Sequence, residues 1–586
     1  MKLVGIHRLV LPTNRVPGGY LGPPCEPGPQ LLVQHATDCG IKRADTLNLL
    51  GRDFESLGRT ECGGTRRSGR TEFNAEASGS RPGYGRPNQL RGTAPAADVA
   101  ARATCPTVQT LVTGAERTAM ALNLLVVCID TLRADLLDRS DVQMPHLRHY
   151  VTEGTRFTHA FGEAQPTVQT RRTFFTGRRS FPWRFQVDTK GLGGNGATGW
   201  HKIPPEQPTL AERLVDVGYA TGLVADTYHI FKPTMNFTRG FLSWEFIRGQ
   251  ESDPYRAGFL PERALADHLP PGQVVDPKRH AVMYQYLLNN RGRRSEEDWT
   301  AAQVFRVAER WLADNRDNQP FFLWVDSFDP HEPWDPPPGY ADRYFQADGV
   351  RDYIFPQSFE GISEAEKART AALYYGEVTF VDRLLGSLLE RLECLGLRED
   401  TLVAIVSDHG TELWDDGRFR KSEAHLHPYN TQLNLVVLHP KGMGAGQTVR
   451  GFVQGHDLAP TLLDLLGVAH ERLDGENFWD LITGSRSVLR DHVVTGWGRR
   501  ASIRDEWYNV CLTYTAEDER PEVFDLQADP QEKLNLAPTR PEVIAQARSR
   551  LEVVLGHPTP CPLTEGPDPT VYSLRRWVAH RFPSLS

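Results

Sequence analysis

The sequence LNLLVVCIDTLRAD, Leu122 to Asp135, contains the first clear structural signal in the chain. Its first part, Leu122 to Ile129, is apolar at all but one position, which is typical of a buried strand. The run is about 8 residues long, far short of the roughly 20 that span a bilayer. It ends directly in Asp130, so the sequence predicts a buried strand with a carboxylate at its carboxyl end.

Similar patterns predict the rest of the fold. Residues 155–161, 321–328, 401–407 and 433–438 are predicted strands, and residues 145–153, 299–315, 367–395 and 459–466 are predicted helices. Helices between buried strands indicate an α/β class with a mainly parallel sheet covered on both faces. In such sheets, ligands bind beyond the carboxyl ends of the strands.

Residues 1–119 differ from the rest of the chain. They are rich in Gly, Arg, Pro and Ser and show neither helical nor strand periodicity. Two interpretations stay open: a disordered extension, or a leader that results from a wrongly assigned start codon. In both, the folded part begins at Met120.

The composition excludes several classes of protein. Of the 586 residues, 39% are hydrophobic and 24% charged, as in ordinary globular proteins, and the net charge of −8 predicts no general affinity for nucleic acid. No segment is long and apolar enough for a membrane span. The eight cysteines show no CxxC pairs, so we expect a reducing, cytoplasmic location.

A second strand also ends in polar residues. Asp408 and His409 follow the predicted strand in TLVAIVSDHG, residues 401–410, just as Asp130 follows the first strand. Oxygen and imidazole donors without thiolate suit a divalent ion such as Ca²⁺, Mg²⁺, Mn²⁺ or Zn²⁺. The alternative is that such an aspartate caps the following helix.

Seven motifs occur in an order and spacing that resemble the sulfatase family of the alkaline phosphatase superfamily. They are NLLVVCIDTLRADLL, MPHLRHYVTEGTRFTHAF, RRTFFTGRR, FDPHEPWDPP, VSDHGTEL, HDLAPTLLDLLGV and EVFDLQADPQEKLNLA. The resemblance implies a sulfatase-like α/β/α sandwich over residues 120–484. It also implies a smaller C-terminal α+β domain over residues 485–586.

The resemblance also implies roles for individual residues. Asp130, Asp408 and His409 match metal ligands, but Thr131 stands where the family usually has a second acidic or amide ligand, and nearby Asp135 is a possible substitute. Arg171 matches the arginine that ends the nucleophile motif. The residues that match cations holding the anion and protonating the leaving group are His331, Lys421 and His427.

Thr167 occupies the nucleophile position, in TVQTR at residues 167–171. Sulfatases have Cys or Ser there, which is oxidised to formylglycine. Threonine would give a ketone, so formylglycine is not expected. Other branches of the superfamily resemble this arrangement with Thr as nucleophile and metal ligand, and there the reaction is phosphoryl transfer.

The predicted function is metal-dependent hydrolysis of a small anionic ester, with one or two divalent ions. The family name suggests a sulfate ester, whereas Thr167 and His409 favour a phosphodiester or phosphonate ester. The alternative is a catalytically silent anion-binding protein with the same fold. The sequence pattern does not identify the organic group of the substrate or the oligomeric state.

Overall fold

The computed structural model describes residues 121–183, 199–200, 202–233, 235–270, 272–274, 277–356, 361–424, 426–515 and 520–560. The prediction for residues 1–119 lies outside this part of the chain. None of the helices within the described ranges is both long and apolar enough to cross a membrane.

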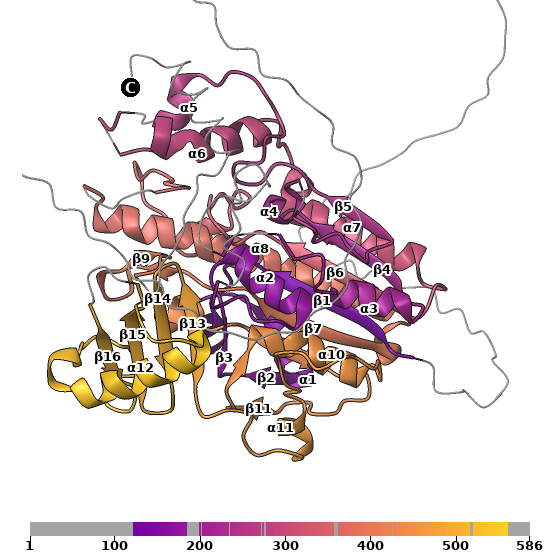
Figure 1. Cartoon of the computed structure of the whole chain (residues 1–586). Helices are drawn as coiled ribbons and strands as arrows, with labels where there is room; N and C mark the ends of the chain where they lie inside the picture. The colour runs from indigo at the N-terminus through magenta and orange to yellow at the C-terminus, as the bar shows by residue number, and fades with distance from the viewer. Residues whose placement is uncertain are drawn as a thin grey trace, which may run out of the picture. The chain divides into compact units, whose positions relative to one another are not determined.

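An eight-stranded sheet contains the buried strands that the sequence predicts (Figure 1). In spatial order its strands are β11 (Thr448–Val449), β2 (Thr155–Phe157), β10 (Leu435–Leu438), β7 (Thr401–Ser407), β1 (Asn123–Ile129), β6 (Phe321–Ser327), β4 (Ala220–Ala225) and β5 (Ser243–Phe246). Strands β7, β1, β6, β4 and β5 run parallel, whereas β10 is antiparallel to both of its neighbours. The mainly parallel sheet is therefore confirmed.

Helices cover both faces of this sheet, and α12 covers the C-terminal sheet described below. The α-helices are α1 (Pro145–Glu153), α2 (Thr167–Thr176), α3 (Leu210–Asp216), α4 (Tyr228–Phe231), α5 (Glu262–Ala266), α6 (Pro277–Asn290), α7 (Thr300–Asp314), α8 (Glu364–Cys394), α9 (Pro428–Thr431), α10 (Leu458–Leu465), α11 (Asp480–Thr483) and α12 (Pro541–Leu555). Leu125 and Val127 of β1 share a core with α1, α7 and α8. Leu124 and Val126 share the opposite core with α2, α3 and α10, because successive strand residues point to opposite faces. The architecture is the expected α/β/α sandwich.

Some predicted boundaries were wrong. The single strand predicted over residues 155–161 is two: β2 lies in the main sheet, whereas β3 (Ala160–Phe161) pairs with β12 (Val453–Gln454). The long helix α8 begins before residue 367 because Ser363 and Glu366 form a capping box. Strand β4 was not predicted. Its Gly222 is needed because a Cβ there would lie 2.4 Å from the Trp311 ring.

The C-terminal part has a second, antiparallel sheet. Its strands are β13 (Val493–Trp497), β14 (Arg500–Arg504), β15 (Tyr508–Thr513) and β16 (Glu522–Asp525), paired in that order. Helix α12 covers it, and Leu551 packs with Ile503 and Leu512. Ala164 and Phe181, from the segments that flank α2, enter the same core. The small sheet therefore supports the segments on either side of the predicted nucleophile helix.

Candidate metal and nucleophile site

The carboxyl ends of β1 and β7 bring three predicted ligands together. The strands pair in register, with Ile129 opposite Ser407, so Asp130 and Asp408 leave the sheet side by side. Ligand atoms of Asp130, Asp408 and His409 all lie within 4.8 Å of one another, and all three residues are buried. This group, the metal cluster below, lies at the sheet edge where the sequence predicts a divalent-ion site.

The ring of His409 is oriented as a metal ligand. Its Nδ1 lies 2.9 Å from the carbonyl oxygen of Gly410, to which an Nδ1–H group would donate. The Nε2 atom then carries the lone pair, and it lies 3.6 Å from Asp130 Oδ1 and 3.5 Å from Asp408 Oδ2. Burial lowers the pKa of His409 to about 4, so the ring is neutral at pH 7, the form that binds metals.

Thr131 lies at the cluster in an unusual backbone conformation. Its φ angle is 59°, which β-branched residues rarely adopt. In this conformation its hydroxyl donates to Asp130 Oδ1 at 2.8 Å and its backbone N–H donates to Asp408 Oδ1 at 3.0 Å. Thr131 therefore acts as a hydrogen-bond donor that orients both carboxylates. Asp135 accepts two hydrogen bonds from Arg133, and the cluster found among the described residues does not include it.

Thr167 faces this cluster from the first position of α2. Its side-chain oxygen lies 3.4 Å from His409 Nε2, and the residue is 2% exposed. The unpaired N–H groups of a helix N-terminus favour nearby negative charge. One turn later, Arg171 reaches back, and its Nη1 donates to the Thr167 carbonyl oxygen at 3.3 Å. The position suits an oxygen nucleophile that attacks an anionic group.

Arg171 is surrounded by carboxylates. It forms a two-pronged ion pair with Asp326, at 2.9 and 2.8 Å, and further pairs with Asp130 and Asp408. All four residues have fully buried side chains. Asp326 is the residue before the last in strand β6. Sequence reasoning missed it although it shows a signal similar to that of Asp130: an aspartate near the carboxyl end of an apolar strand.

The charges of this group fit a divalent cation. Three carboxylates face one guanidinium, which leaves two negative charges uncompensated among these four residues. Asp130 Oδ2 lies 3.1 Å from Arg171 Nη2, yet it accepts no hydrogen bond from any described residue. Burial raises the pKa of Asp130 well above its usual range, and the charge of Asp408 raises it further. Bound Ca²⁺, Mg²⁺, Mn²⁺ or Zn²⁺ would relieve both effects.

His331 and Lys421 meet at a buried carboxylate, that of Glu332. Lys421 Nζ donates to Glu332 Oε2 at 2.6 Å, and Lys421 is close enough to lower the pKa of both Asp130 and His409. The ring of His331 lies with its centroid 6.2 Å from that of His409. Burial, followed by the charge of Lys421, lowers the pKa of His331 to about 3 despite nearby Glu332. These two predicted residues therefore lie beside the cluster.

His427 has different surroundings. Its Nδ1 lies 2.8 Å from Glu532 Oε2, and its ring packs against Phe524 at a centroid distance of 5.0 Å. Glu532 also accepts hydrogen bonds from Asn509 and Arg504. These contacts tie His427 to the C-terminal sheet, and a role in protonating the leaving group stays a prediction.

Sequence reasoning also missed a histidine near the site. His229 in α4 pairs with Glu251 at 2.7 Å. Burial would raise the pKa of Glu251, but the charge of His229 and its hydrogen bond lower it to about 2. The only sequence signal was a short segment, TYHIF, directly after an apolar stretch. The sequence did not show that this segment lies near the site, because that depends on β4 lying next to β6 in the sheet.

Two family models match this chain. A family model described as "Sulfatase" matches residues 122–468. A second, described as "N-sulphoglucosamine sulphohydrolase, C-terminal", matches residues 414–555. The first match includes the three residues of the metal cluster and Thr167.

Individual relatives are distant. An arylsulfatase of Clostridium perfringens is 23% identical over 463 residues, which cover 71% of this chain and 90% of the relative. A multifunctional alkaline phosphatase superfamily protein of Trinickia caryophylli is 24% identical over 495 residues, which cover 71% and 91%. The phosphonate monoester hydrolase of Agrobacterium radiobacter has a similar fold, with a TM-score of 0.57 and 20% identity over 74% of this chain and 95% of that one.

Proposed function

Because the chain belongs to the sulfatase family, we propose that it is a metal-dependent hydrolase of an anionic ester, with Thr167 as the nucleophile. Among sulfate, phosphodiester and phosphonate esters, we favour the phosphorus esters. We also propose that residues 120–484 form the catalytic domain and residues 485–586 the C-terminal domain. A cytoplasmic location stays a prediction.

One observation carries this proposal: the side-chain oxygen of Thr167 lies 3.4 Å from His409 Nε2, within the buried site that contains Asp130 and Asp408. A threonine with a structural role only would not need to direct its hydroxyl at an acidic cluster. The N-terminus of α2 adds a partial positive charge where an anionic ester would approach.

Asp130, Asp408, His409 and Thr167 would hold the ion. A divalent cation held there would lower the pKa of the Thr167 hydroxyl and so favour a nucleophile near neutral pH. Arg171 keeps Asp130 and Asp408 in place and contacts the Thr167 backbone. Its fully buried guanidinium makes it a residue that positions the nucleophile.

Lys421 and His331 have separate tasks. The ammonium group of Lys421 would stabilise negative charge on the equatorial oxygens of the transferred group. Nδ1 of His331 lies 2.6 Å from the Glu332 carbonyl oxygen, so Nδ1 carries the proton and Nε2 the lone pair. In this neutral form His331 accepts a proton, and it must first gain one before it can protonate a leaving group.

The preference for phosphorus esters follows from the balance of the reaction. Attack by Thr167 forms a bond from its oxygen to phosphorus and breaks the bond to the leaving group, which departs with a proton. Water then hydrolyses the phosphorylated threonine and restores the hydroxyl. Sulfatases release sulfate by elimination from a formylglycine hydrate, and unmodified threonine has no second hydroxyl for that step.

A panel of esters tests the proposal. Purified protein is incubated with aryl sulfates, phosphodiesters and phosphonate monoesters, each with added Mn²⁺, Ca²⁺, Mg²⁺ or Zn²⁺. We expect metal-dependent turnover of a phosphorus ester that EDTA abolishes. Turnover of sulfate esters alone would overturn the substrate preference. Tight anion binding without any turnover would indicate the catalytically silent protein instead.

A further inference from the structure

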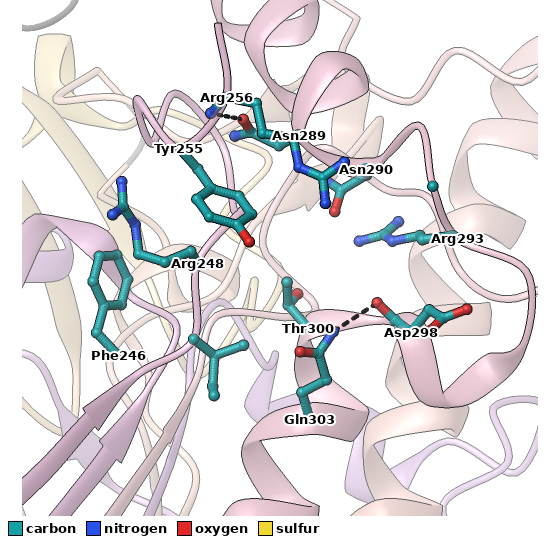
Figure 2. A pocket seen from close by; sticks show the side chains of 12 residues that line it. Phe246, Arg248, Tyr255, Arg256, Asn289, Asn290, Arg293, Asp298, Thr300 and Gln303 are labelled. Atoms are coloured by element: carbon teal, nitrogen blue, oxygen red, sulfur yellow. Dashed lines mark hydrogen bonds between the residues drawn. The ribbon is translucent and has the colours of Figure 1, made fainter.

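A polar cavity lies between the segment after β5 and the segment that joins α6 to α7. Its volume is about 320 Å³, and its lining includes Arg248, Arg256 and Arg293 (Figure 2). It shares no residue with the metal cluster. Three arginines around one small cavity indicate a site for an anion.

Each arginine keeps side-chain N–H groups for which the described part of the chain offers no acceptor. Arg293 pairs with Asp335 at 3.0 Å through Nη1, but its buried Nε and Nη2 have no acceptor among the described residues. Arg248 uses Nε and Nη2 to bind Asp253, and its Nη1 makes no hydrogen bond to another described residue. For Arg256, the described side chains provide no ion pair.

Aromatic rings hold these guanidinium groups in place. Arg248 lies 5.2 Å and Arg256 5.3 Å from the centroid of the Tyr255 ring, and Arg293 lies 4.6 Å from that of Trp299. Cation–π contacts of this kind orient a guanidinium without consuming its in-plane donors. The donors are therefore partly organised before any ligand binds.

The carboxylate of Asp298 in the lining is already engaged. One of its oxygens accepts the backbone N–H groups of Arg294 and Ser295, at 2.8 and 3.0 Å. Asp298 is thus directed at its own loop. The lining residues carry three positive charges and one negative charge.

The cavity adjoins the catalytic region through one glutamine. Gln250 donates to Thr300, a lining residue, at 2.7 Å, and to Asp329 at 2.5 Å. Asp329 lies two residues before His331 in sequence. Burial raises the pKa of Asp329 to about 6, and the charge of Arg293 opposes this rise. The cavity is therefore a neighbour of the site and not part of it.

We propose that this cavity is a second binding site, specific for a tetrahedral oxyanion such as phosphate or sulfate. The oxyanion is either a free ion or the terminal group of a larger molecule, because the same N–H donors recognise both. This site does not depend on the proposed hydrolysis.

Calorimetry with inorganic phosphate tests the proposal on the full-length protein. The variants are Arg256→Gln and Arg248→Gln, and the control is Arg306→Gln, an exposed arginine of α7 outside the cavity. We expect each cavity variant to weaken one phosphate site by about tenfold or more, the size of a lost charge-assisted hydrogen bond. The control should bind phosphate as the wild type does.

Phenylphosphonate, which has no ester bond, distinguishes a free oxyanion from the terminal group of a larger molecule as the ligand. Tighter binding than inorganic phosphate at the cavity identifies the terminal group of a larger molecule, and equal or weaker binding identifies a free ion. If both cavity variants bind phosphate as tightly as the control does, the proposal is wrong.

Discussion

Replacing Thr167 with Ala removes the proposed nucleophile and little else. The hydroxyl makes one long contact, 3.4 Å from His409, and the residue is small, so the loss of stability should be about 1–2 kcal/mol. Globular proteins are stable by about 5–15 kcal/mol, so the variant should stay folded. Loss of a covalent nucleophile should lower kcat/KM by about ten-thousandfold, equivalent to about 5 kcal/mol.

The assay measures kcat/KM on the most active ester of the panel, with saturating metal, together with thermal unfolding. Thr170→Ala is the matched control: it is one turn further along α2, fully buried, and its hydroxyl donates to the Ala164 carbonyl oxygen at 2.6 Å. That variant should lose about 1–3 kcal/mol of stability but less than about tenfold in turnover. Near-wild-type turnover of Thr167→Ala on any ester would refute the assignment.

Two further substitutions at this position separate the alternatives. Thr167→Ser keeps the oxygen and should retain a measurable part of the activity. Thr167→Cys restores the first residue of the sulfatase motif, but Gln169 still replaces its proline, so we expect no formylglycine and little activity. Intact-protein mass spectrometry detects the conversion of thiol to aldehyde, and finding it would contradict this expectation.

Three other perturbations test the surroundings of the site. Asp408→Ala should abolish metal binding and activity, and stoichiometric metal in elemental analysis of that variant would remove Asp408 from the ligand set. Asp326→Asn should lower the free energy of unfolding by about 3 kcal/mol because Arg171 loses its two-pronged partner. The control, Glu245→Gln, breaks an exposed ion pair and should lower it by less than about 1 kcal/mol. Equal effects of the two variants in denaturant titrations would contradict this. Burial raises the pKa of Glu163 from 4.5 to about 7. The stability linked to the protonated carboxyl is therefore fully present below pH 4.5, and about 3 kcal/mol of it is lost as the pH rises through 7. Glu163→Gln should remove this dependence, and an unchanged stability profile between pH 4.5 and 8 would show that the carboxyl is ionised throughout.

Local sequence determined much of the architecture. Apolar runs such as residues 122–129 and 401–407 are long enough to mark buried strands, and the polar residues that follow them mark the functional edge of the sheet. Asp130, Asp408 and His409 could be found in this way because both of their strands are continuous apolar segments. Short elements such as β4, with its small residues and Gly222, carry too weak a signal.

The tertiary structure decided the pairings between distant residues. Arg171 meets Asp326, 155 positions away, only because β6 lies next to β1 in the sheet. His427 meets Glu532 across 105 positions because the C-terminal sheet packs on this side of the site. The arginines of the cavity likewise come from two distant segments, Arg248 and Arg256 from the one after β5 and Arg293 from the one after α6. Periodicity reports which face of an element is buried, but the order of strands depends on long-range packing, and that order selects the partner of each buried charge.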